Sequence, residues 1–147
     1  MPRRYVAVCG ASEATASQLA SAREVGRLLA EAGVVVINGG LGGVAGAASE
    51  GASRAGGTVV GILPDTDRRG ANPHLTVSLP SGMGQARNVL IVTAAESVIA
   101  IGEGWGTLSE IAIARRLGRP VVALDSWTVK GLDAVGTPAD AVRRALE

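Results

Sequence analysis

Short apolar runs alternate along the chain with longer stretches in which apolar residues recur at helical spacing. The short runs, rich in Val, Ile and Leu, predict buried strands at residues 5–9, 34–38, 58–63, 75–79, 97–101 and 120–124. The helical patterns cover about residues 17–32, 44–55, 84–95, 107–117 and 137–146. Gly33 is a suitable end for the first helix, and Pro138 suits the first turn of the last one.

The order of these elements, βαβαβ followed by βαβαβ and a final helix, predicts an α/β fold: a Rossmann-like doubly wound parallel sheet with helices on both faces. We expect a single domain over residues 1–147, because neither a repeat nor a low-complexity tract interrupts the pattern. The aliphatic, Gly-rich composition without Phe suits helices packed closely on such a sheet. Ligands bind beyond the carboxyl ends of the strands in this fold, so the loops after residues 9, 38 and 101 are expected to converge on one site.

The loop after the second predicted strand, Gly39–Gly46, is the strongest candidate for a phosphate site. Gly39, Gly40, Gly42 and Gly43 allow successive backbone N–H groups to point inward as an anion-binding nest. The alternative is a tight turn followed by close packing of a helix on the sheet. The segment lacks the Gly-Lys-Ser/Thr of a P-loop, and it does not follow the first strand as the dinucleotide fingerprint does.

A second strand–loop–helix unit contains Gly102, Gly104 and Gly106 around Trp105, and a helical pattern starts at Thr107. Glycines let a ligand approach the backbone closely, and the free N–H groups at the start of a helix favour an anion. The loop after the first strand, with Gly10 and Ser12, is predicted to lie at the same edge.

Four side chains at this edge leave alternatives open. Thr107 and Glu110 have the spacing of a capping box, with Thr107 at the N-cap, but Glu110 is also placed to bond a ligand. Arg87, early in a predicted helix, is either a ligand contact or a solvated surface charge. Trp105 either stacks on a base or a pterin-like ring, or packs at a subunit contact.

Composition and charge narrow the function classes. The formal charge of +1 gives no polybasic field, so neither nucleic acid nor an anionic membrane surface is an expected partner. The single cysteine, Cys9, excludes an intramolecular disulfide and is expected to be a buried small hydrophobe. His74 has no companions at metal-ligand spacing, so no metal site is predicted. The chain from Met1 shows neither a signal-peptide pattern nor a membrane-length apolar run, which predicts a cytoplasmic protein.

Three of these segments together resemble the Lonely Guy (LOG) superfamily of Rossmann-like proteins, long mislabelled as lysine decarboxylases. Its enzymes are cytokinin-activating phosphoribohydrolases with a Gly-rich phosphate loop, an Arg-bearing helix start and the pattern Pro-Gly-Gly-x-Gly-Thr-x-x-Glu. The matching segments here are Gly39–Gly46, Met83–Arg87 and Gly102–Glu110. The chain is most similar to a short subgroup with Ala-Arg-Asn followed by Gly-x-Gly-Thr-Leu-Ser-Glu-Ile, which is related to the molybdenum cofactor carrier proteins.

The chain also departs from the enzymes of that superfamily at three points. Asn88 stands where they carry Lys, and Ser109 replaces the first Glu of their Glu pair. Glu103 replaces a glycine, which puts a carboxylate into a loop expected to meet an anion. The resemblance implies that Arg87 and Glu110 act on a ribosyl phosphate, as catalytic residues only if the protein is an enzyme.

These observations predict a binding or carrier protein for a phosphorylated heterocycle, such as a nucleotide monophosphate or the molybdenum cofactor. The alternative is a nucleoside 5′-monophosphate phosphoribohydrolase that cleaves the N-glycosidic bond. No cofactor is expected to be required, and a homo-oligomer, dimer or higher, is expected. The predicted ligand-binding residues are Gly10, Ser12, Gly39, Gly40, Gly42, Gly43, Gly102, Gly104, Trp105, Gly106 and Thr107.

Overall fold

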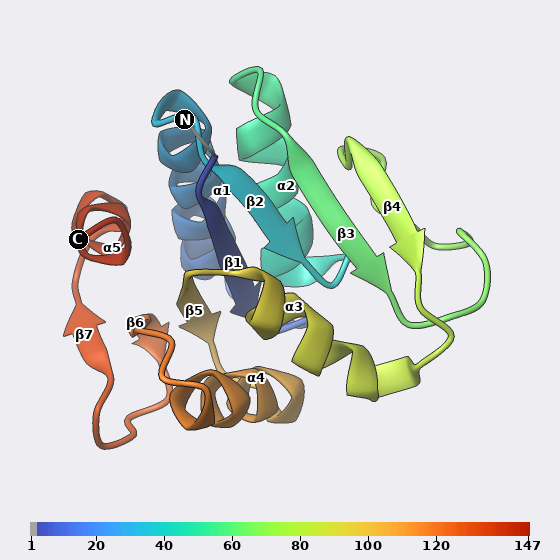
Figure 1. The fold of residues 1–147 in the computed structure, drawn as a ribbon. Helices are drawn as coiled ribbons and strands as arrows, with labels where there is room; N and C mark the ends of the chain where they lie inside the picture. Colours follow the sequence, from blue (N-terminus) through green and yellow to red (C-terminus); the bar gives the residue numbers. More distant parts are fainter. Residues whose placement is uncertain (1–2) are drawn as a thin grey trace.

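The computed structural model describes residues 3–147, and Met1 and Pro2 of the predicted domain lie outside the described residues. Within residues 3–147 seven strands form one sheet in the order β4-β3-β2-β1-β5-β6-β7, and every neighbouring pair is parallel (Figure 1). The strands are β1 (Tyr5–Gly10), β2 (Val35–Asn38), β3 (Val59–Leu63), β4 (Val77–Pro80), β5 (Ser97–Gly102), β6 (Val121–Ser126) and β7 (Asp133–Val135). The predicted doubly wound α/β fold is confirmed.

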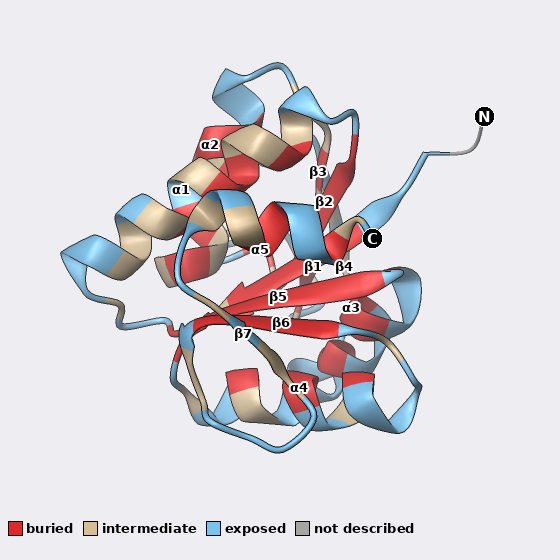
Figure 2. Cartoon of the chain, turned by 90° about the vertical axis from the view of Figure 1, so that its left-hand side faces the viewer, coloured by how far each residue is buried: buried red, intermediate tan, exposed pale blue. Residues whose placement is uncertain are grey.

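Helices cover both faces of this sheet, and alternate strand residues point to opposite faces. The helices are α1 (Ala16–Glu31), α2 (Gly43–Arg54), α3 (Asn88–Ala94), α4 (Trp105–Arg116) and α5 (Pro138–Ala145), and a 3₁₀ turn, η1 (Gly84–Arg87), leads into α3. Val6 and Val8 of β1 pack in a core with α1, α2 and α5, whereas Ala7 and Cys9 pack with α3 and α4. Figure 2 shows the central strands buried between these two layers.

Three local predictions need correction. β7 was not predicted, because its sequence Asp-Ala-Val is too short and too polar to form an apolar run. The helix predicted over residues 84–95 is divided into η1 and α3. The helix predicted from Thr107 begins two residues earlier, at Trp105.

The order of strands reverses between β1 and β5, and the loops at their carboxyl ends are joined by backbone hydrogen bonds. The Ala11 N–H donates to the Ile101 carbonyl oxygen over 3.2 Å, and the Val44 N–H donates to the Ala11 carbonyl oxygen over 3.0 Å. The loops after β1, β2 and β5 therefore converge at one edge, as predicted. Within residues 3–147 no helix is both long and apolar enough to cross a membrane.

Candidate functional site

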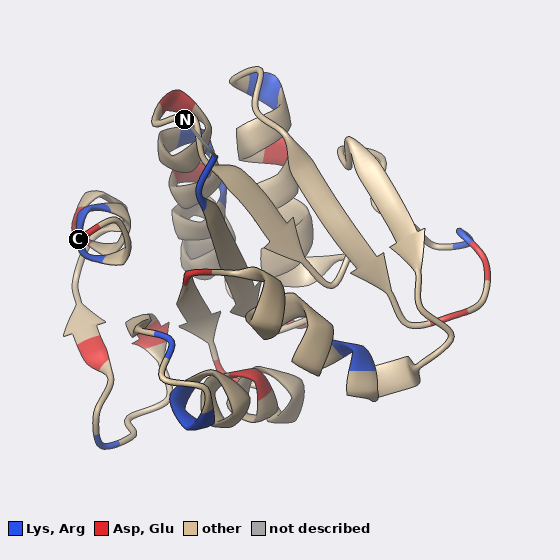
Figure 3. Ribbon diagram, viewed as in Figure 1, with Lys and Arg blue, Asp and Glu red and all other residues tan. Residues whose placement is uncertain are grey.

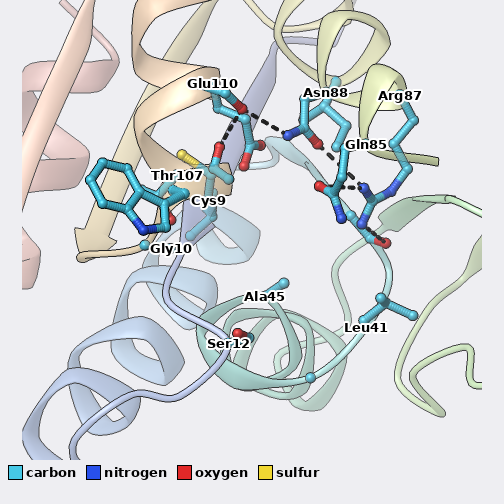
Figure 4. A pocket seen from close by; sticks show the side chains of 18 residues that line it. Cys9, Gly10, Ser12, Leu41, Ala45, Gln85, Arg87, Asn88, Thr107 and Glu110 are labelled. Atoms are coloured by element: carbon cyan, nitrogen blue, oxygen red, sulfur yellow. Dashed lines mark hydrogen bonds between the residues drawn. The ribbon is translucent and has the colours of Figure 1, made fainter. Parts of the chain in front are cut away.

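A cavity of about 530 Å³ lies at this edge, within the size range of small-molecule sites. Its walls come from the end of β1, the loop after β2, η1 with α3, and the start of α4 (Figure 4). Most of the predicted site residues line it, namely Gly10, Ser12, Gly39, Gly42, Arg87, Gly104, Trp105, Gly106, Thr107 and Glu110. The convergence of three loops explains why residues so distant in sequence share one wall.

Three predicted ligand-binding glycines, Gly40, Gly43 and Gly102, do not line the cavity. Each has a φ near +70°, a conformation that suits glycine. The Gly40 N–H donates to Asn38 Oδ1 over 2.8 Å, and a Cβ at Gly43 would collide with the backbone of the loop after β1. Gly40 and Gly43 therefore shape their loop, which agrees with the alternative interpretation of Gly39–Gly46 as a tight turn with close packing.

Helices α2 and α4 begin at the cavity without a side-chain cap. Their N-cap residues are Gly42 and Gly104, and neither helix start receives a side-chain hydrogen bond. A helix start leaves its first N–H groups without helical partners and carries a partial positive charge. Two such ends facing one cavity favour an anionic ligand.

The capping box predicted at Thr107 and Glu110 is wrong. Because α4 begins at Trp105, both residues lie inside the helix, and Gly104 occupies the N-cap position. The Thr-x-x-Glu pattern was misleading because the true N-cap, Gly104, has no side chain that would mark it as a cap in the sequence. A capping box does occur at the start of α1, where Thr15 and Gln18 exchange side-chain hydrogen bonds with each other's backbone N–H groups.

Arg87 is buried at the cavity wall, with 6% of its surface exposed. Its Nε donates to the Ile62 carbonyl oxygen over 2.8 Å, and Nη2 donates to the Gly39 carbonyl oxygen over 3.4 Å. The alternative of a solvated surface charge is therefore wrong. Burial lowers the Arg87 pKa, while the charges of Glu110 and Asp65 oppose that shift.

Glu110 projects from the second turn of α4 into the same cavity and is 8% exposed. Burial raises its pKa to about 8, against the opposing effect of the Arg87 charge. Within residues 3–147 Arg87 and Glu110 form no ion pair, although other charges of both signs are scattered over the helices and outer loops (Figure 3). The cavity thus holds two buried ionisable side chains that form no ion pair with each other.

Sequence reasoning missed a polar chain that joins the two sides of the cavity. Arg87 Nη1 donates to Asn88 Oδ1 over 3.4 Å, and Asn88 Nδ2 donates to Ser109 Oγ over 3.0 Å. Ser109 Oγ in turn donates to the Gly106 carbonyl oxygen over 2.7 Å. Asn88 and Ser109 were recognisable only as departures from the LOG enzymes, and their spacing along the chain gave no sign that they pair.

Other residues around the cavity were also missed. Its wall includes, besides Asn88 and Ser109, the side chains or backbone of Val8, Cys9, Leu41, Ala45, Gln85 and Ile91. Cys9 is buried, as predicted, and burial raises the pKa of its thiol well above the usual value. Apolar residues in a strand carry no sequence signal that separates a cavity wall from the core.

The expectation that Glu103 meets the anion is not supported by its position. Glu103 is absent from the cavity wall and lines a separate hollow with Glu13, Gln18 and Asp125. Among residues 3–147 no group of His, Cys, Asp or Glu side chains has the arrangement of a metal site. His74 Nε2 lies 3.9 Å from Glu50 Oε2.

Trp105 stands at the rim of the cavity with 79% of its surface exposed. Its ring lies 5.5 Å from that of Trp127, centroid to centroid, at a tilt of 36°. Trp127 Nε1 donates to the Gly104 carbonyl oxygen over 3.1 Å, which anchors this pair to the start of α4. Both alternatives for Trp105, ring stacking and subunit contact, need such exposure.

The doubly wound sheet, the glycine-rich loop after β2, the buried arginine before α3 and the Gly-x-Gly-Thr-x-x-Glu start of α4 define a LOG-like Rossmann protein. The chain belongs to the SLOG cluster4 family, whose family model matches residues 3–144. The resemblance to the LOG superfamily and its subgroup related to molybdenum cofactor carriers is confirmed.

Individual relatives extend over almost the whole chain. An uncharacterized protein of Archaeoglobus fulgidus is 43% identical over 99% of this chain and 97% of its own length. The molybdenum cofactor binding protein of Rippkaea orientalis has a TM-score of 0.93 and 30% identity, covering 98% of this chain and 96% of that one. The molybdenum cofactor carrier protein of Chlamydomonas reinhardtii has a TM-score of 0.91 and 25% identity, covering 99% and 97%.

Proposed function

We propose that this protein binds and carries a phosphorylated heterocycle, a nucleotide or a molybdenum cofactor-like ligand, in the cavity between α2 and α4. The observation that carries the proposal is the pair of uncapped helix starts at a cavity that also holds the buried Arg87. Backbone N–H groups and a guanidinium are the donors that proteins use for phosphate.

The phosphate is assigned to the start of α2, next to Gly42. A Cβ at Gly42 would have no atom within 4 Å, so the space in front of this helix start is open. Arg87 contacts the same loop three residues earlier, where its Nη2 donates to the Gly39 carbonyl oxygen. In this arrangement the helix dipole and the Arg87 charge act on the same anion.

The similarity to proteins named for the molybdenum cofactor supports a carrier role for this chain. That cofactor is a phosphorylated pterin, which combines an anion with a flat heterocycle. In the proposed role it is cargo, and the exposed Trp105 at the rim is placed to cover its ring.

A hydrolase role is the second candidate, because Glu110 and Arg87 share the cavity and the Glu110 pKa of about 8 suits proton transfer near neutral pH. Asn88, which stands in the position of the enzymes' Lys, is held by Ser109 and supplies no cation. We therefore expect slow or absent release of free base from AMP or isopentenyl-AMP, measured by chromatography. Robust turnover that disappears in both Arg87→Ala and Glu110→Gln would establish the hydrolase instead.

Native mass spectrometry of protein purified without added ligand tests the binding role, and a co-purified phosphorylated heterocycle is the expected result. Calorimetric titration then compares AMP with adenosine, and AMP should bind about 30-fold more tightly because of its charge-assisted hydrogen bonds. Gly42→Val should remove this advantage by filling the phosphate space. Gly136→Val is the matched control, since Gly136 also has open surroundings but lies before α5. Equal affinities for AMP and adenosine would contradict the proposal.

A further inference from the structure

The cavity contains two polar groups to which the protein itself gives no partner. No hydrogen bond from residues 3–147 reaches the carboxyl group of Glu110, and the hydroxyl oxygen of Thr107 is buried without a partner. Figure 4 shows both side chains next to Cys9 at one end of the cavity, with Leu41 at the other end. Buried polar groups in native proteins are normally satisfied, so a ligand is expected to satisfy these two.

The surroundings of this end favour a ring over a sugar. Cys9 and Ile91 line the cavity and belong to the apolar cluster beneath α3 and α4. A flat heteroaromatic ring can lay its face on such residues and present its polar edge to Glu110. A ribose carries hydroxyl groups in several directions and would leave some of them against apolar side chains.

We infer that Glu110, with Thr107 beside it, binds a ring edge that carries two adjacent N–H donors, as in the 2-amino-4-oxopyrimidine edge shared by pterins and guanine. This inference rests on the proposed function and names the class of ring that the site selects. A carboxylate offers two acceptor oxygens, which match a pair of parallel N–H donors, and hydrogen bonds to a charged acceptor are the stronger ones. The Thr107 hydroxyl can bond the neighbouring polar atom of the ring.

The arrangement keeps the two negative charges apart. The proposed phosphate position is at the start of α2, and Glu110 lines the opposite end of the cavity, with Arg87 in the wall between the elements that form it. Arg87 from η1 and Cys9 from β1 are the charged and titratable groups that act on Glu110 or respond to its charge. The positive charge of Arg87 favours the ionised carboxylate that the pair of donors requires.

Binding of such an edge is therefore expected to release a proton. In the protein without ligand, Glu110 has a pKa of about 8, so much of its carboxyl group is protonated near neutral pH. The donor pair binds only the ionised form, and its affinity should rise as the pH increases toward 8. The ratio of GMP to IMP affinity isolates the contribution of the second N–H donor, because both nucleotides carry the same phosphate and differ only in the 2-amino group.

The test is a calorimetric titration of the full chain with GMP, IMP and AMP. GMP is expected to bind at least about tenfold more tightly than IMP or AMP, since each of these leaves a buried acceptor unsatisfied. Glu110→Gln should remove the preference, because its amide NH₂ would face a ring donor. Glu103→Gln is the matched control: it makes the same substitution two residues before α4 begins at Trp105, yet Glu103 lines a separate hollow.

The outcomes separate this inference from the proposed function. Equal binding of all three nucleotides, a preference for AMP, or equal weakening of all three by Glu110→Gln would overturn the inference and leave the carrier role in place. In the last case Glu110 would bond the common ribose. Failure of all three nucleotides to bind would count against the proposed function itself.

Discussion

Helices α1 and α5 begin differently from α2 and α4, and the difference follows their position relative to the cavity. Thr15 caps α1 by accepting from the Gln18 N–H over 3.1 Å, and Thr137 caps α5 by accepting from the Asp140 N–H over 3.1 Å. Helices α2 and α4 start with Gly42 and Gly104 and receive no side-chain cap.

The two kinds of helix start differ in what their N-cap residues contribute to stability. A threonine N-cap contributes about 1 kcal/mol, which the two helices at the cavity forgo. At the start of α2 the Val44 N–H already donates to the Ala11 carbonyl oxygen, but the other N–H groups at these two starts receive no side-chain cap. The starts of α1 and α5 are capped by threonine side chains of the protein. A threonine at the N-cap, as in α1 and α5, thus indicates a helix start that the protein itself stabilises. A glycine at the N-cap, as in α2 and α4, indicates a helix start without a side-chain cap.

The largest effect of a single substitution on stability is expected at the uncapped start of α2. Gly43 has a φ of +65°, and a Cβ there would collide with the backbone of Ala11 and Ser12. Gly43→Val should lower the free energy of unfolding by roughly 3 kcal/mol or more, the combined cost of backbone strain and overpacking. Gly42→Val, in open space and with extended backbone, should cost less than about 1 kcal/mol in the same urea titration. Equal losses would show that the two glycines do not divide into a structural and a cavity position.

The next effect concerns the pH dependence of stability. The Glu110 pKa is raised from 4.5 to about 8 in the folded protein, so between these values the folded state holds a proton that the unfolded state has lost. Stability should therefore fall as the pH rises from about 4.5, by up to about 1.4 kcal/mol per pH unit, and this contribution should level off above about pH 8. Urea titrations from pH 5 to 9 on wild type and Glu110→Gln check this point, because the Gln variant lacks that slope. Parallel pH profiles for the two proteins would mean that Glu110 is ionised throughout.

The smallest effect is expected at the capped helices. Thr15→Ala removes the side-chain acceptor of the α1 cap and should lower the free energy of unfolding by about 1 kcal/mol. Affinity for AMP should stay unchanged, since Thr15 does not line the cavity. Thr137→Ala should behave in the same way at α5. A marked loss of AMP affinity in either variant would remove the distinction between the two kinds of helix start.

The sequence predicted the sheet and the convergence of the loops well, for a physical reason. Buried parallel strands such as β2 and β5 are continuous apolar runs, and the glycines after them mark the loops. The three-residue strand β7 was missed, because pairing with β6 rather than its own composition makes it a strand.

The site was predicted less completely than the fold. The glycine positions near the cavity could be found, but the division between Gly42 at the cavity and Gly43 against the first loop depends on backbone angles that a run of glycines does not reveal. The start of α4 was misplaced by two residues, which made Thr107 seem a cap. The burial of Arg87 depends on carbonyl groups from β3 and the loop after β2, contacts that lie far apart in sequence.

The central claim, that the uncapped start of α2 binds the anion of the ligand, is tested most directly by Gly42→Asp. Gly42 has the extended backbone of an N-cap, so the new carboxylate should cap α2 and keep the thermal midpoint of the free protein at or above that of wild type. The same carboxylate should occupy the proposed phosphate position and repel the phosphate of AMP. AMP affinity measured by calorimetry should therefore fall by about tenfold or more. The control Gly136→Asp should leave AMP affinity unchanged. A Gly42→Asp protein that is folded and binds AMP within about twofold of wild type would contradict the account.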